Sequence, residues 1–366
     1  MSKESIAGQR TFYYWLDPIR ALAATLVLLV HVRSVMFETY GNLDASSQNI
    51  FTVIFFAICG LGGFAVCLFY ILSGFLVGGK SIEKAMQGIL TPRRFFLDRL
   101  FRIGVPLSGA LVLICIVNGI IGQGVDWVQL FGQYLGLQGV LTQDYGGVFW
   151  TLPYEIWFYA AILAILLICG KKRHILTGSL VLMLALMVFC NLVPHFLYIL
   201  VCGIICYLAK DYKFSSVTLR VLWCLTFMLF IIYFLCHVHY FAAVYGFSDI
   251  SAKAEGPTQI ALFTAIALVL SQYVGAKPHS RAGIMVNNIG RQIAVFSYSL
   301  FLTHYQVLKI WEYYMPKYKN VDLTTMSSFL MLCLACIFVA YVFYYIFERN
   351  TRKIQSSAES VLNYND

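Results

Sequence analysis

Residues 16–31 read LDPIRALAATLVLLVH, a stretch in which nearly every side chain after Arg20 is apolar. A helix needs about 20 such residues to cross roughly 30 Å of hydrocarbon. Similar runs recur almost to the end of the chain, of which 60% is apolar and 12% is charged, with a mean hydropathy of +0.77. Soluble globular proteins do not have this composition. The sequence therefore predicts an all-α, polytopic membrane helix bundle.

Ten membrane-spanning helices are expected from the apolar runs that are bounded by charges or turn residues. Their approximate limits are 18–37, 51–79, 102–121, 149–169, 174–190, 194–209, 219–237, 258–275, 292–311 and 326–347. The segment 127–143 is too short to cross and is expected to lie along the membrane interface. Residues 1–366 are interpreted as a single transmembrane domain, with helices between about 18 and 350, short tails and no soluble catalytic domain.

The distribution of positive charge predicts the orientation of these helices. Loops rich in Lys and Arg stay on the cytoplasmic side, and placing the N-terminus there puts most of the 26 basic residues on that side. We therefore expect cytoplasmic N- and C-termini in the inner membrane of a cell. The net charge of +9 follows from this topology and requires no nucleic-acid partner. The eleven cysteines lie in or beside apolar runs, which favours neither a disulfide framework nor a metal site.

Two ionisable residues occur within the first predicted span. Arg20 and His31 are eleven positions apart, which is about 17 Å along a helix and within about 20° of the same face. Ionisable groups inside a membrane are costly and therefore indicate function by default. The structural alternatives are a snorkelling Arg20 paired with Asp17, and an inert His31 bonded to a carbonyl group. One face that bears both residues favours the functional interpretation.

Two stretches near the predicted cytoplasmic side carry further candidates. Ser73 lies near the end of the run GGFAVCLFYILSGFLVGG, where small residues permit close approach of a ligand, although helix packing is their commoner use. Arg99 and Arg102 lie one turn apart in LTPRRFFLDRLFRIGVP. Such arginines usually set topology, but guanidinium groups also bind phosphate through paired hydrogen bonds.

Glu155 and His304 are expected at about the same depth as His31. Glu155 lies in the stretch FWTLPYEIWFY, and His304 lies in VFSYSLFLTHYQVL. The structural alternatives are a Glu155 that caps backbone groups freed by Pro153, and a His304 that is packed between helices. Three titratable groups at one level favour a shared polar cavity.

These stretches together resemble the acyltransferase 3 family of integral-membrane acyltransferases, which includes O-acetyltransferases of O-antigen and other surface polysaccharides. The similar stretches are LDPIRALAATLVLLVH, LFYILSGFL, DRLFRIGVP, FWTLPYEIWFY, FSYSLFLTHYQV and, more weakly, YYIFERNTRK. They follow the family's order from residue 16 to about 350. Two positions depart from the pattern, because Pro18 stands where Gly is usual and Cys67 stands where an acidic residue is frequent.

The resemblance implies an enzyme that transfers an acetyl group from cytoplasmic acetyl-CoA to a sugar hydroxyl of a lipid-linked or polymeric glycan. Acetyl-CoA is then a co-substrate, and no permanently bound cofactor or metal is expected. The residues expected to bind the CoA donor are Arg20, Arg99, Arg102 and Ser73.

The resemblance also implies roles on the acceptor side. His31 is the expected general base, since a neutral imidazole is suited to removing a hydroxyl proton near pH 7. Glu155 is expected to orient that imidazole or to bind the acceptor. The candidate acceptor or cavity residues are His304, Tyr154 and Trp150. The outward loop from about 122 to 148 is a candidate cover for the sugar.

A polytopic transporter is the alternative from another functional class, because intramembrane His and Glu residues also serve proton relays. The sequence shows no internal repeat, which weighs against a transporter. A second alternative is a subunit that translocates acyl groups to a separate transferase. A succinyl or longer acyl group in place of acetyl, an acyl-enzyme intermediate and a homo-oligomeric state stay open.

Overall fold

The computed structural model describes residues 13–170, 174–237 and 248–363, and every regular element among them is helical. Within these ranges no β-strand forms, and extended pairing is limited to isolated bridges such as the one between Phe37 and Tyr318. The predicted all-α fold class is therefore confirmed.

The α-helices follow one another along the chain from α1 to α16. Their bounds are α1 Leu16–Met36, α2 Ile50–Cys59, α3 Gly62–Ser73, α4 Lys80–Met86, α5 Pro92–Ile120, α6 Trp127–Leu135, α7 Leu152–Cys169, α8 Ile175–Phe189, α9 Pro194–Ala209, α10 Ser216–His237, α12 Ser248–Tyr273, α13 Arg281–Ala294, α14 Ser297–Tyr314, α15 Leu323–Phe343 and α16 Thr351–Asn363. Two π-helical segments, η3 Gly74–Gly79 and η5 Tyr344–Glu348, continue α3 and α15 in the described chain.

Six helical stretches of the described chain are long and apolar enough to cross a membrane. They are Leu16–Met36, Ile50–Met86, Pro92–Ile120, Phe149–Cys169, Ser216–Leu235 and Leu323–Ser360. The apolar helices α8 and α9 are shorter. These lengths and compositions are those of a multi-pass membrane protein. Each of the ten predicted ranges is mainly helical. The number of helices that cross the membrane and the side on which the termini lie stay predictions.

The structure interrupts two of the predicted spans. A turn at Gly60 and Leu61 separates α2 from α3 within the range 51–79, and a turn at Val295 and Phe296 separates α13 from α14 within 292–311. α13 exposes apolar side chains such as Met285 and buries the polar Asn287. A helix with such opposed faces is typical of the membrane interface.

α5 begins at Pro92, ten residues before the predicted start at 102. The hydroxyl of Thr91 accepts a hydrogen bond from the backbone N–H of Arg94 (3.3 Å), and Pro92 occupies the first helical position. Both features favour a helix start. As a result, Arg99 and Arg102 lie inside a continuous helix and not in the loop that precedes it.

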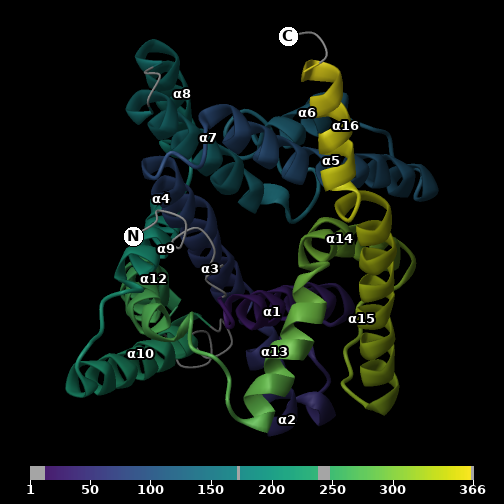
Figure 1. Ribbon diagram of the computed structural model, residues 1–366. Helices are drawn as coiled ribbons and strands as arrows, with labels where there is room; N and C mark the ends of the chain where they lie inside the picture. The colour runs from purple at the N-terminus through teal and green to yellow at the C-terminus, as the bar shows by residue number, and fades with distance from the viewer. Residues whose placement is uncertain (1–12, 171–173, 238–247, 364–366) are drawn as a thin grey trace.

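α1 lies in the middle of the bundle and packs against α2, α3, α13, α14 and α15 (Figure 1). The small residues Ala21, Ala23 and Ala24 are buried there, and small side chains let membrane helices approach closely. α13 crosses α1 at Pro18, where a Cβ added to Gly290 would lie 2.6 Å from the Cα of Pro18. Gly290 therefore permits the close approach of α13 to the backbone of α1 at Pro18.

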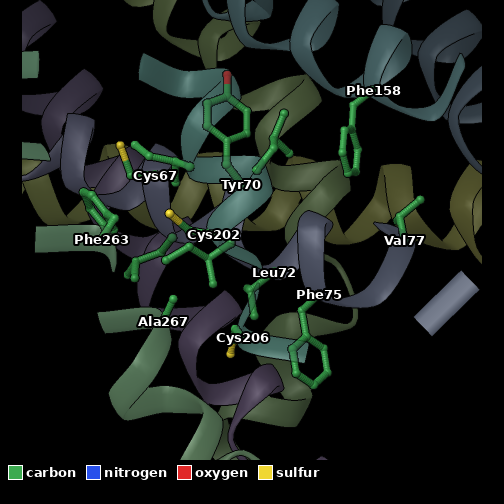
Figure 2. Packing of buried hydrophobic residues seen from close by; sticks show 14 of the residues in the cluster. Cys67, Tyr70, Leu72, Phe75, Val77, Phe158, Cys202, Cys206, Phe263 and Ala267 are labelled. Atoms are coloured by element: carbon green, nitrogen blue, oxygen red, sulfur yellow. The ribbon is translucent and has the colours of Figure 1, made fainter. Parts of the chain in front are cut away.

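α3 and η3 pack against α9 with their backbones in contact. A Cβ added at Gly203 would lie 2.8 Å from the Cα of Gly74 and would overlap the carbonyl oxygen of Ile71. Figure 2 shows the apolar residues around this contact, which come from α3, η3, α7, α9 and α12. The side chains of Cys67, Cys202 and Cys206 are buried there.

We expect Gly203→Ala to lower the stability of the protein by about 1–3 kcal/mol, because an added methyl group overpacks the α3–α9 contact. The matched control is Gly119→Ala in α5, where an added Cβ meets nothing within 4 Å and should leave stability unchanged or slightly higher. Thermal unfolding in detergent measures both variants. Equal melting temperatures for the two would contradict this account of the packing.

Candidate functional site

A cavity of about 350 Å³ lies between α1, α3, α5, α7 and α14. Along α1 its lining runs from Arg20 to Val27, which is about 10 Å of helix. Both π-helical segments of the described chain border it, through Leu76 and Val77 on η3 and Glu348 on η5. Such segments are rare and occur often at functional sites.

Five basic side chains line this cavity, together with the carboxylates of Asp98, Glu155 and Glu348. The basic residues are Arg20, Lys80, Lys84, Arg99 and Arg102. All four predicted donor-site residues line this cavity, although they come from three separate helices. They are Arg20, Ser73, Arg99 and Arg102.

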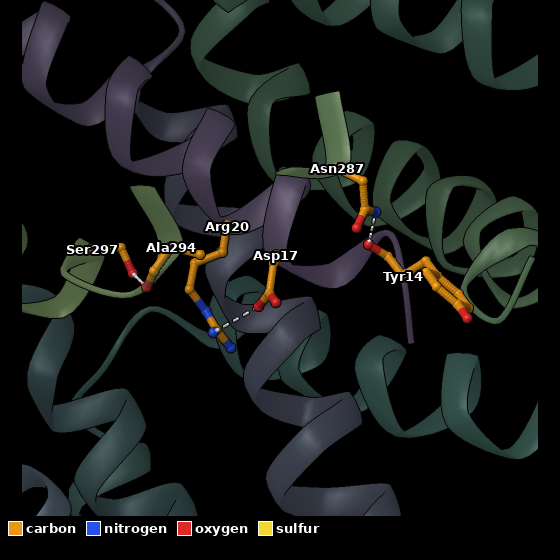
Figure 3. A network of polar contacts seen from close by, with 6 residues as sticks. All are labelled: Tyr14, Asp17, Arg20, Asn287, Ala294 and Ser297. Carbon is orange, nitrogen blue, oxygen red and sulfur yellow. Dashed lines mark hydrogen bonds and ion pairs between the residues drawn. The ribbon is translucent and has the colours of Figure 1, made fainter. Parts of the chain in front are cut away.

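Arg20 and Arg99 are held by different kinds of contact. Arg20 pairs with Asp17 at 3.5 Å, as Figure 3 shows. The guanidinium group of Arg99 lies over the rings of Phe95 and Tyr159, at 5.7 and 5.5 Å from their centroids. Arg20 therefore has the pairing expected of a membrane anchor, and it also faces the cavity.

The segment before α1 is fixed by polar contacts with α13. The side-chain amide of Asn287 donates to the carbonyl oxygen of Tyr14, and Ser297 at the start of α14 donates to the carbonyl of Ala294 (2.9 Å; Figure 3). The Asn287 bond ties the segment just before α1 to α13, and the Ser297 bond closes the turn between α13 and α14.

Glu155 lies in the wall of the cavity beside two hydroxyl groups. Its Oε1 accepts hydrogen bonds from the hydroxyls of Tyr159 (2.6 Å) and Ser73 (3.0 Å). Within the described chain its side chain makes no hydrogen bond to His31, which it was expected to orient. The sequence predicted one depth for the two residues, but depth along a helix does not determine which neighbour a side chain faces.

Two hydrogen-bond donors in the lining are buried without a hydrogen-bond partner among the described residues. They are the hydroxyl of Tyr298 and the Nε of Arg99. An unpaired buried donor costs about 1–3 kcal/mol, so both groups are suited to a ligand that presents oxygen acceptors. Tyr298 was not singled out in the sequence, although it lies in the same stretch as His304.

His31 and His304 form a pair just beyond the inner end of the cavity. The Nδ1 of His31 lies 3.1 Å from the Nε2 of His304, and the Nδ1 of His304 lies 2.7 Å from the carbonyl oxygen of Leu300. The cavity lining includes Val27 and Phe301, which precede the two histidines by about one helical turn. The predicted proximity of His31 and His304 is therefore present in the structure.

The loop between α6 and α7 packs against Tyr305, the residue after His304. Asp144 Oδ1 accepts from the backbone N–H groups of Gly146 (3.0 Å) and Gly147 (3.1 Å), and its Oδ2 accepts from that of Trp150 (3.2 Å). Gly147 has φ +79°, a conformation that favours glycine. A Cβ added there would collide with the ring of Tyr305. Burial raises the pKa of the Asp144 carboxyl against the effect of these hydrogen bonds. The stretch DYGG at residues 144–147 is typical of a turn and could have predicted this anchored loop from the sequence.

Tyr154 and Trp150 lie beside α9 and not at the histidine pair. The hydroxyl of Tyr154 accepts from the backbone N–H of Val193 (2.8 Å), and the ring of Trp150 lies 5.6 Å from that of Phe196. Trp150 is exposed. No group of three or more His, Cys, Asp or Glu residues in the described chain is placed to hold a metal ion.

The model of a protein family described as an acyltransferase domain matches residues 13–345 of this chain. No curated protein and no solved structure matches the chain.

Replacing Asp144 by Ala removes the acceptor of three backbone N–H groups, so we expect stability to fall by about 1–3 kcal/mol. Asp144→Asn keeps one acceptor oxygen for the two glycine N–H groups and should lose less. As a control, Asp211→Ala removes an exposed carboxylate that pairs with Lys210 (3.0 Å) and should change little. Thermal unfolding measures all three, and an Ala variant as stable as the wild type would show that the loop is not anchored here.

Proposed function

This chain belongs to the acyltransferase 3 family, and from that premise we propose that it transfers an acetyl group from cytoplasmic acetyl-CoA to a sugar hydroxyl of a surface or exported polysaccharide. The observation that carries the proposal is one cavity that is lined by Arg20, Arg99 and Arg102 and whose lining reaches Val27, about one helical turn before His31. We propose that the arginines bind the nucleotide at one end of this path and that the base acts on the hydroxyl at the other.

The arginine end is proposed to hold the phosphates of CoA. Guanidinium groups bind phosphate oxygens through paired, charge-assisted hydrogen bonds, and the unpaired Nε of Arg99 is one available donor. Lys80 and Lys84 add charge at the same end. A cavity of about 350 Å³ is at the small end of ligand pockets, which suits the pantetheine arm with the nucleotide near its mouth. For cytoplasmic acetyl-CoA, this end faces the cytoplasm.

The middle of the cavity is proposed to hold the thioester end of the donor. The carboxylate of Glu155, fixed by Ser73 and Tyr159, accepts an amide N–H of the pantetheine arm. The free hydroxyl of Tyr298 donates to the thioester carbonyl oxygen, where negative charge develops during attack. Donors placed at a developing oxyanion are among the strongest catalytic contributions.

His31 is proposed to act as the general base. Its imidazole takes the proton of the sugar hydroxyl while the hydroxyl oxygen forms a bond to the thioester carbonyl carbon. The carbon–sulfur bond then breaks, the sugar ester forms, and the thiolate of CoA takes up the proton that His31 holds. The reaction needs no further reactant, and His31 returns to its neutral form.

The acceptor side is proposed to lie at the outer loop. Asp144 holds the loop against Tyr305, whose ring lies 6.2 Å from that of His31, and the exposed Trp150 offers a face on which a sugar ring can stack. Tyr154 has a structural role there, since its hydroxyl is used by the backbone of Val193. His304 is proposed to act together with His31 and not to contact the sugar.

Arg102→Gln should raise the KM for acetyl-CoA about tenfold, because a charge-assisted hydrogen bond to phosphate contributes about 1.5–3 kcal/mol. His31→Ala should still bind labelled acetyl-CoA but should not consume it. Arg94→Gln is the matched control for charge, since Arg94 is exposed on the same helix and does not line the cavity. Purified protein in nanodiscs with labelled acetyl-CoA and membrane glycan provides the assay.

The outcomes of this assay separate the alternatives. A folded wild-type protein that neither binds nor consumes acetyl-CoA would refute the proposal and favour a transporter. Consumption that requires a second protein would favour a subunit that passes acyl groups to a separate transferase.

Tyr298→Phe removes one hydroxyl that has no hydrogen-bond partner in the described chain. We expect turnover to fall about tenfold, while the melting temperature stays unchanged or rises, because an unpaired buried polar group is lost. Tyr313→Phe, at an exposed position of the same helix, should have neither effect. Unchanged turnover in Tyr298→Phe would exclude the hydroxyl from the reaction.

A further inference from the structure

We propose that His304 is a positioning residue that holds the His31 imidazole in the tautomer whose Nε2 is free of a proton. The proposal deepens the function above and rests on it for its kinetic consequence. The tautomer itself is a property of the resting protein and can be measured without substrate.

The first step concerns the proton on His304. Its Nδ1 lies 2.7 Å from the carbonyl oxygen of Leu300, one turn earlier on α14. A carbonyl oxygen can only accept a hydrogen bond, so the Nδ1 of His304 carries a proton. In a neutral imidazole the other nitrogen is then an acceptor, and this nitrogen, Nε2, faces α1.

The second step transfers this constraint to His31. The Nδ1 of His31 lies 3.1 Å from the Nε2 of His304. Two acceptors at this distance would oppose lone pairs, so the Nδ1 of His31 must be the donor. The neutral His31 therefore has an unprotonated Nε2.

The same contacts assign different roles to the two histidines. Both nitrogens of His304 are used, and its side chain is only 1% exposed. His31 is partly exposed, and of its two nitrogens only Nε2 is left by these bonds to accept the proton of a substrate. His31 is thus the residue that reacts, and His304 acts through it.

The pair also accommodates the charge that forms during the reaction. When Nε2 of His31 takes a proton, the ring becomes a cation and its Nδ1–H bond to His304 becomes charge-assisted, which strengthens it. A carboxylate partner would stabilise this cation more. A neutral imidazole instead favours return of the proton, here to the thiolate of CoA.

The test compares two substitutions at His304. In His304→Gln the side-chain carbonyl can still accept from the Nδ1 of His31, whereas His304→Leu offers no acceptor. We expect His304→Leu to lower kcat about 100-fold and His304→Gln to lower it less than about tenfold, both with an unchanged KM for acetyl-CoA. The same pair of substitutions at the exposed His279 should have no effect. Equal losses in the Gln and Leu variants, or a wild-type kcat in His304→Leu, would overturn the proposal.

A second measurement does not depend on turnover and uses a variant only to assign the signals. Nitrogen-15 chemical shifts of histidine-labelled wild-type protein in nanodiscs report which ring nitrogen carries the proton, with His31→Ala used for assignment. We expect His31 to be protonated at Nδ1 and not at Nε2 when neutral, and the reverse result would overturn the proposal. If the wild type shows this tautomer but does not consume acetyl-CoA, the proposed function fails while the assignment of the tautomer stands.

Discussion

A polar side chain inside a membrane protein must find its partner within the protein, because lipid offers none. In this chain the hydrogen bond between His31 and His304 meets that requirement for two ring nitrogens at once. It joins α1 to α14 across 273 positions of sequence, and it lies where the cavity from the arginine end stops. The contact ties α1 to α14 near Val27 and Phe301, which line the cavity.

The surrounding packing allows this polar core to exist. Glycines at the α3–α9 contact and at the crossing of α13 with α1 bring backbones together where a Cβ would collide. Close packing of this kind is how membrane helices associate when apolar burial gives little advantage over lipid. The π-helical segments continue α3 and α15 at the border of the cavity, where Leu76, Val77 and Glu348 line it.

Along α1 the charged Arg20 and the proposed base His31 are well separated. Arg20 lies in the first turns, where the phosphate groups of the proposed donor remain near water, and His31 lies about three turns further on. Between them the lining becomes apolar at Val27 and Phe69. A thioester can enter such a region more easily than a nucleotide can, since burying charge without a partner is costly. This division suits the proposed acyl donor, which has a charged head and a long flexible arm.

Much of this protein was predictable from sequence. Composition and the lengths of apolar runs predicted the all-α membrane bundle, because the bilayer sets the length of a helix that crosses it. Helical periodicity placed Arg20 and His31 on one face of α1, and ordered motifs pointed to Arg99, Arg102 and Ser73, which the structure brings to one cavity. Periodicity did not reveal the turn that separates α13 from α14. It also could not show that Glu155 faces Ser73 and Tyr159, that Tyr298 has a free hydroxyl, or that His304 sets the tautomer of His31. The reason is physical: sequence determines the depth and face of a residue on its own helix, whereas its partner is decided by how distant helices pack together.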